Sequence, residues 1–253
     1  MKALAVAALL VSGAAAEARF APKRDTPYRL VRVQEHTDGR GQRRFESERS
    51  VTFSRAPGGY VARIELIATR DSDADSHYAL LATAMGGRAI MVDLDAAGQL
   101  QQVRELDAIW ARLREAIGQT ATRDDLRLAL WRLHDAATTT QREEAVVGVL
   151  LTALGPGDAE RARGIRTVTL PSTGVGQASG LTGVERVSID GPRVEIDTQA
   201  SGVAGGLSRH RIVDRRTGLL IEQRDEQRGH ALVSGVNHEI VDRTIVTLSA
   251  PVS

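Results

Sequence analysis

The spacing of apolar residues changes twice along this chain of 253 residues, and this change constrains its fold more than any other feature. On both sides of the centre, apolar residues recur at every second position, as they do from Tyr60 to Ala68. Between residues 105 and 154 they recur at helical spacing. The first period is typical of strands with one buried face, and the second is typical of helices. The sequence therefore predicts strands, then three helices, then strands again.

Turn signals separate the predicted strands into consecutive hairpins. Asp38-Gly39 and Asp190-Gly191 each stand between two alternating segments, and Ala-Pro-Gly-Gly at residues 56–59 forms a third signal. Glycine takes the positive φ angles of tight turns without steric cost. Strands that follow one another through short turns pair antiparallel. We therefore expect an α+β protein whose helices pack on one face or end of an antiparallel sheet.

The helices are predicted from apolar stripes and from end signals. Gly118 is expected to end the first helix, and a capping box from Thr140 to Glu143 is expected to begin the third. Gly155-Pro156-Gly157 is expected to stop that third helix. The buried stripe of the second helix is expected to contain Leu126, Leu130 and Leu133, widened by Leu128 and Trp131.

The N-terminus has the pattern of a secretory signal peptide. Met1 and Lys2 are followed by an apolar run from Ala3 to Gly13 and by small residues at positions 14–16. The alternative, an uncleaved membrane anchor, needs about 20 apolar residues, and this run is shorter. Cleavage near Ala16 or Ala18 would place the mature protein in the periplasm or outside the cell.

The two changes in the spacing of apolar residues, together with the predicted signal peptide, divide the chain into four parts. These are the signal peptide (1–16), an N-terminal β-rich part (17–104), a helical segment (105–158) and a C-terminal β-rich part (159–253). Residues 17–253 are of a length that suits one composite domain.

Composition excludes several classes of function. The formal net charge is +1, so electrostatics give no reason to expect nucleic acid as a partner. The chain has no cysteine, which excludes disulfides, a thiol nucleophile, thiolate metal sites and a lipid anchor on an N-terminal cysteine. No integral membrane segment is expected after signal cleavage, and no cofactor motif is present.

No motif identifies catalytic residues or a metal site. The acidic stretch from Asp71 to Asp75 lacks the glycine and glutamate of a calcium loop and is interpreted as a solvated turn. His238-Glu239 begins like a metalloprotease motif, but Asp242 occupies the position of the second histidine. The catalytic residues are therefore unknown, and no metal is expected.

Trp110 and Trp131 are the candidate ligand-binding residues. They fall on consecutive predicted helices among leucines. They would line an apolar groove between the helices and the sheet. The alternative is ordinary packing in the core, where large aromatic side chains are common.

Three segments carry a resemblance to known proteins: RFAPKRDTPYRLVR, DLDAAGQLQQVRELDAIWARLREAI and RHRIVDRRTGLLIEQ. Together they make the chain similar to uncharacterised signal-peptide-bearing periplasmic proteins of alphaproteobacterial type. The hairpin from Asp214 to Leu219, with the predicted sheet and helices, also resembles the periplasmic lipoprotein-carrier half-barrel. That resemblance implies a curved, half-barrel-like sheet with a concave apolar surface for acyl chains. The central three-helix segment, which we expect to pack against the sheet, departs from the simplest form of that fold.

These observations predict a non-enzymatic, soluble periplasmic protein that binds a lipid, another apolar ligand or an envelope protein. One alternative is a hydrolase whose active site is assembled from dispersed Asp, His and Ser residues of the second half, because triads are spatial rather than sequential. A structural envelope protein is the other alternative.

Overall fold

The computed structural model describes residues 20–39, 41–72, 87–120, 124–170, 180–203, 205–233 and 236–250. The predicted signal peptide, most of the acidic turn that follows Asp71 and residues 121–123, just before the second helix, lie outside these residues. Among the described residues, no helix has the length and apolar character needed to cross a membrane.

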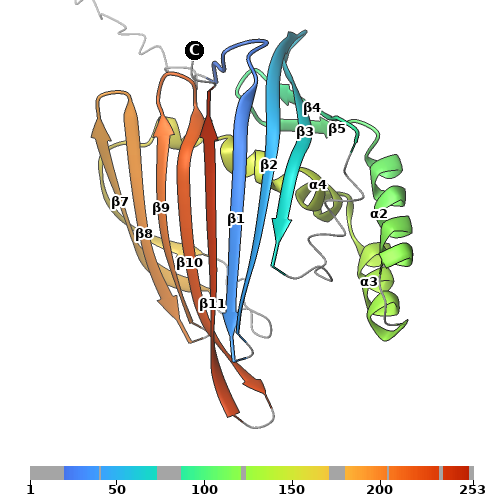
Figure 1. The fold of residues 1–253 in the computed structure, drawn as a ribbon. Coiled ribbons are helices and arrows are strands. Elements are labelled where there is room, and N and C mark those ends of the chain that lie inside the picture. Colours follow the sequence, from blue (N-terminus) through green and yellow to red (C-terminus); the bar gives the residue numbers. More distant parts are fainter. Residues whose placement is uncertain are drawn as a thin grey trace, which may run out of the picture.

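Eleven antiparallel strands form one curved sheet that does not close on itself. Their order from edge to edge is β5-β4-β3-β2-β1-β11-β10-β9-β8-β7-β6, so β1 and β11 are neighbours at the centre (Figure 1). The strands are β1 (Tyr28–Asp38), β2 (Gly41–Ala56), β3 (Gly59–Asp71), β4 (Ile90–Asp95), β5 (Leu100–Val103), β6 (Gly164–Leu170), β7 (Leu181–Asp190), β8 (Arg193–Gly202), β9 (Gly205–Asp214), β10 (Leu219–Val233) and β11 (Val236–Ser249).

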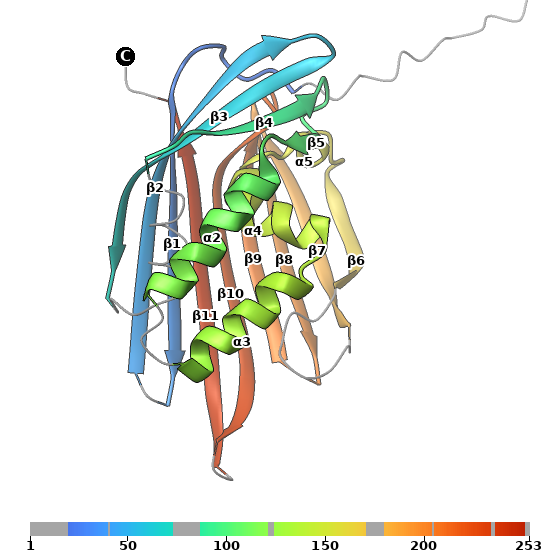
Figure 2. The ribbon, with the colours of Figure 1, turned by 90° about the vertical axis from the view of Figure 1, so that its right-hand side faces the viewer.

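The helical segment connects the two opposite edges of this sheet. It leaves from edge strand β5, crosses the concave face and ends at edge strand β6 (Figure 2). Its helices are α2 (Leu106–Thr120), α3 (Asp124–Ala136), α4 (Thr139–Ala153) and α5 (Pro156–Ala159). The predicted fold class, α+β with a curved half-barrel-like antiparallel sheet and a central helical segment, is confirmed.

Helix α4 lies directly on the sheet. It packs against β1, β10 and β11, whereas α5 packs against β8 and β9, and α3 packs mainly against α2. We call the face under α4 the inner face. One apolar core joins α2 and α4 to the inner face through fully buried side chains that include Leu30, Val51, Phe53, Val147 and Leu150.

The predicted turns are confirmed where the structure describes them. Strands β2 and β3 meet at residues 57–58, and β7 and β8 meet at residues 191–192. Gly58 and Gly191 have φ angles of 85° and 53°, in the region that favours glycine. Gly218, in the turn between β9 and β10, has a φ of 68°. Glycine at these positions sets the hairpin geometry and so the antiparallel order.

Several local predictions about the helices are wrong. The capping box of α4 consists of Thr138 and Gln141, two residues before the predicted one. Helix α2 continues through Gly118 to Thr120, since a single glycine near a helix end is tolerated. In α3 the predicted buried stripe is rotated, because Leu133 is 71% exposed while His134 is buried.

A β-bulge in β3 also changes one strand prediction. Glu48 of β2 pairs with Ala68, and Arg49 pairs with Leu66, so Ile67 is an extra residue between them. The alternation that brings Ile64 and Leu66 to the inner face is therefore interrupted. Ala68 lies on the outer face, although the sequence period predicts the opposite.

Candidate functional site

The most unusual feature of the inner face is a band of polar side chains across it. Pairing registers place these residues on the same face as the buried Leu30 and Phe53. We call this band the polar belt. It consists of Arg166 (β6), Glu185 (β7), Thr198 (β8), Arg209 and Arg211 (β9), Gln223 and Asp225 (β10), Thr244 (β11), Arg32 and Gln34 (β1), and Ser47 and Arg49 (β2).

The belt reverses the usual alternation of a half-buried strand. In β1, Tyr28 and Leu30 face the core, but Arg32 and Gln34 follow them on the same inner face. Val31 and Val33 point to the outer face instead. Strands normally turn polar residues outward when one face is covered. Sequences break this local rule mainly at functional sites, so the belt is the strongest candidate site.

On the side of β6 to β10, the arginines of the belt form ion pairs with carboxylates. Glu185 is buried and accepts from Arg161 at 2.5 Å and from Arg166. The carboxylate of Asp225 accepts two hydrogen bonds from the guanidinium of Arg209, at 2.9 and 3.0 Å, and one from the side-chain amide of Gln223, at 2.8 Å. Each of these carboxylates holds at least one guanidinium, as buried charges require.

Asp158 extends these ion pairs to the helical segment. Its two oxygens accept from Arg161 Nε at 2.6 Å and from Arg211 Nη1 at 2.5 Å. Burial lowers the pKa of Arg211, and the charge of Asp158 opposes that shift. The pair therefore attaches α5 to the inner face of β9.

On β2, Arg49 differs from these paired arginines. Arg49 has no carboxylate within 4.0 Å among the described residues, and its hydrogen-bond partner there is Ser47 Oγ, at 2.6 Å. Ser47 itself is 1% exposed. The side-chain oxygen of Gln34 is buried and has no hydrogen-bond partner.

Burial lowers the pKa of Arg49 to about 10, and the nearby positive charge of Arg32 adds to this shift. The guanidinium therefore still carries its charge at neutral pH. Because a charge removed from water without an opposite charge is unfavourable, the burial of the Arg49 guanidinium is unfavourable for stability.

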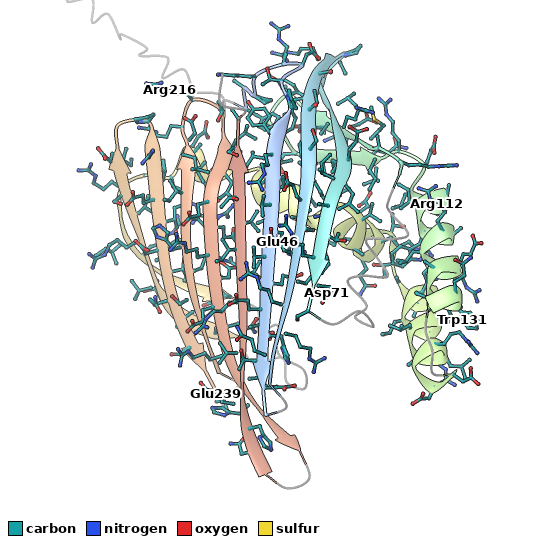
Figure 3. All side chains as sticks on the ribbon, in the orientation of Figure 1. Glu46, Asp71, Arg112, Trp131, Arg216 and Glu239 are labelled. Carbon is teal, nitrogen blue, oxygen red and sulfur yellow. The ribbon has the colours of Figure 1, made fainter. Side chains whose placement is uncertain are left out.

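The two tryptophans proposed from the sequence join α2 to α3. Trp110 is buried and stacks on His134 with ring centroids 4.5 Å apart. Its Nε1 donates to the His134 carbonyl at 3.2 Å, and His134 Nε2 donates to the Trp110 carbonyl at 2.8 Å. Trp131 lies on the helical pair away from the strands (Figure 3) and donates to the Arg114 carbonyl. The structure does not bring these side chains to the polar belt, and their role in ligand binding stays a prediction.

Replacing Trp110 by phenylalanine should lower the free energy of unfolding by about 1 kcal/mol, because it removes one buried hydrogen bond but keeps a stacking ring. Urea denaturation measures this change. Trp131→Phe is the matched control: its hydrogen bond is exposed, so its effect should be smaller. Equal effects of the two substitutions would contradict the structural role assigned to Trp110.

Three histidines pair with aspartates in the described part of the chain. His36 lies 2.6 Å from Asp242, and His210 lies 2.7 Å from Asp197. The third pair is His134 with its neighbour Asp135. Within the described ranges, no serine hydroxyl hydrogen-bonds to these histidines, and no group of three His, Cys, Asp or Glu residues is arranged to hold a metal ion.

Neither protein-family models nor curated proteins match this chain. The polar belt therefore has to be interpreted from its own chemistry. Sequence reasoning missed it, although its signal is present: Arg32, Gln34 and His36 share one parity in a strand that also buries Tyr28 and Leu30.

Proposed function

We propose that this protein binds a small amphiphilic molecule on its inner face, beside the β1–β2 half of the polar belt, and that it does so in the periplasm without catalysing a reaction. The resemblance of its sequence to periplasmic proteins and to the lipoprotein-carrier half-barrel supports both the compartment and the class of ligand.

The observation that carries this proposal is the unpaired, buried side-chain oxygen of Gln34. Buried polar atoms in folded proteins nearly always have a partner, and an exception calls for an explanation. A bound ligand that donates a hydrogen bond supplies that partner.

The neighbours of Gln34 favour a ligand with an apolar part. Phe45 lies opposite Gln34 on β2 and is buried, and the buried Val246 lies on the same face one row away. A site with a few polar groups among apolar side chains is typical of small-molecule binding.

The sheet is open: its edge strands β5 and β6 do not pair with each other, and within the described structure the helical segment connects them.

An uncharged fluorescent probe tests this proposal. The mature chain, purified from the periplasm, should enhance 1-N-phenylnaphthylamine emission saturably, and dodecanol should displace the probe. Phe45→Ala should weaken probe binding about tenfold because it removes the apolar wall beside Gln34. Native mass spectrometry of the same preparation should detect a bound amphiphile.

Ile245→Ala is the control, since Ile245 lies on the outer face of β11 and is 37% exposed. It should leave probe affinity unchanged. If the probe does not bind, or if both substitutions weaken it equally, the protein does not hold an amphiphile at this place.

A further inference from the structure

Strand β6 forms an open edge of the sheet. It pairs with β7 along its whole length and is last in the strand order, so within the described residues no strand pairs with its other side (Figure 2). The nearest helix, α5, packs on β8 and β9 instead. Five of the seven residues of β6 are exposed, and Ile165 is 65% exposed. The strand is therefore accessible to a further strand.

This edge lacks the features with which proteins usually protect an open strand. Such edges are commonly very short, carry lysine or proline, or contain a bulge. Strand β6 has seven residues, no lysine or proline, and a continuous register with β7. Its one charged residue, Arg166, points to the inner face and forms an ion pair with Glu185 of β7. An edge of this kind is a template for pairing with another strand.

The neighbouring hairpin shows which backbone groups of β6 are free. Asp190 and Arg193 flank the two-residue turn between β7 and β8, so they form a hydrogen-bonded pair. Because hydrogen-bonded pairs alternate along a strand, the odd-numbered residues of β7 direct their backbone groups to β6. Their partners are the even-numbered residues of β6. The backbone N–H and C=O groups of Ile165, Thr167 and Thr169 therefore point away from the sheet.

These three residues match a second copy of themselves. A two-fold axis at Thr167 places Thr167 opposite its own copy, and Ile165 opposite Thr169 of the second copy, so every free backbone group gains a partner. On the inner face, Arg166 then lies opposite Val168 of the second copy. An axis at Arg166 would place two guanidinium groups opposite each other, which is unfavourable. An axis at Val168 would pair fewer of the free groups.

We propose that two copies of this protein associate through β6, antiparallel and centred on Thr167, so that their two sheets become one continuous sheet. Val184, which is 49% exposed, lies beside Thr167 on the outer face of β7. Pairing therefore gathers Ile165 and Val184 of both copies on one side of the contact. This inference is independent of the proposed function, because β1 and β2 lie several strands away from β6.

Sedimentation velocity of the full mature chain tests the proposal. Between about 1 and 100 μM the chain should show a reversible monomer–dimer equilibrium, because a contact between two strands is a small interface. Thr167→Pro should abolish the dimer, because it removes a central N–H group. That group does not bond to β7, so the sheet of each copy keeps its ladder. If the unmodified chain is monomeric over the whole range, or if Thr167→Pro still dimerises, the proposal is wrong.

Two substitutions of opposite charge at one position test the register. Val168→Arg should weaken the dimer about tenfold, because the two-fold axis creates two like-charge pairs with Arg166. Val168→Glu is the matched variant: it places an opposite charge at the same position and should leave the dimer at least as stable. Equal effects of the two substitutions would contradict a register centred on Thr167.

Single cysteines locate the axis independently of these variants, because the chain has no cysteine of its own. Thr167→Cys should form a disulfide-linked dimer on mild oxidation, since the Cα atoms of a hydrogen-bonded pair are about 5.5 Å apart. Ile165→Cys is the control, because its two copies would lie about 14 Å apart. Both positions are exposed, so folding should be unaffected. Equal cross-linking of both variants, or of neither, would overturn the proposed pairing.

Discussion

Asp158→Asn is expected to lower the free energy of unfolding by about 3–5 kcal/mol, because removing one partner of a buried ion pair leaves the other charge uncompensated. Asp158 and Arg211 are both largely buried, and Asp158 also holds Arg161. The substitution hardly changes the side-chain volume, so the loss reports charge rather than packing. Urea denaturation at neutral pH measures it.

Two further variants identify the cause of this loss. Adding Arg211→Met to Asp158→Asn should recover a large part of the lost stability, because the double variant no longer buries an unpaired guanidinium. Asp107→Asn breaks an exposed pair with Arg142 and should leave the melting temperature unchanged. A small effect of Asp158→Asn, equal to that of Asp107→Asn, would mean that the ion pair does not attach α5 to β9.

Phe53→Ala should destabilise the protein by about 3–5 kcal/mol, the usual effect of removing a buried aromatic ring. The side chain is fully buried, and its ring packs edge-to-face against Phe20 and Tyr28, with centroid distances of 5.7 Å in both cases. The cavity would lie where the residues before β1 meet the sheet. Urea denaturation measures the change, and trypsin digestion should then cut faster after Lys23 and Arg24.

Ile67→Ala serves as the control for Phe53→Ala. Ile67 is the bulge residue of β3 and is 59% exposed, so the substitution should change stability by no more than about 0.5 kcal/mol. A loss below 1 kcal/mol for Phe53→Ala would show that the ring is not part of the central core.

Much of the fold could be predicted because its signals are local. The alternation from Tyr60 to Leu66, the glycine of each hairpin turn and the helical spacing around Trp110 all act within a few residues. They determine element type and antiparallel pairing. Boundaries depend on smaller differences, and the cap of α4 therefore begins at Thr138 rather than at Thr140. Helix α5 was missed because Pro156 and Gly157 also signal the end of a helix.

The candidate site could not be predicted for a different reason. Arg32 shares its parity with Tyr28 and Leu30, but the opposite parity of the same strand carries Val31 and Val33, so the local pattern alone does not decide which face is covered. The position of Arg32 on the inner face depends on the register of β1 against β2 and β11, and β11 lies about 200 residues further along the chain. Only long-range pairing decides which face the helices cover.

The strand order has a consequence for biosynthesis. Among the described strands, β1 and β11 form the only neighbouring pair that is not consecutive in sequence. Each half of the sheet therefore assembles from local hairpins, which form rapidly. The seam between them closes only after the last strand has left the ribosome. Until then, a nascent chain exposes the hydrogen-bonding edge of β1, the kind of edge through which strands of different molecules associate.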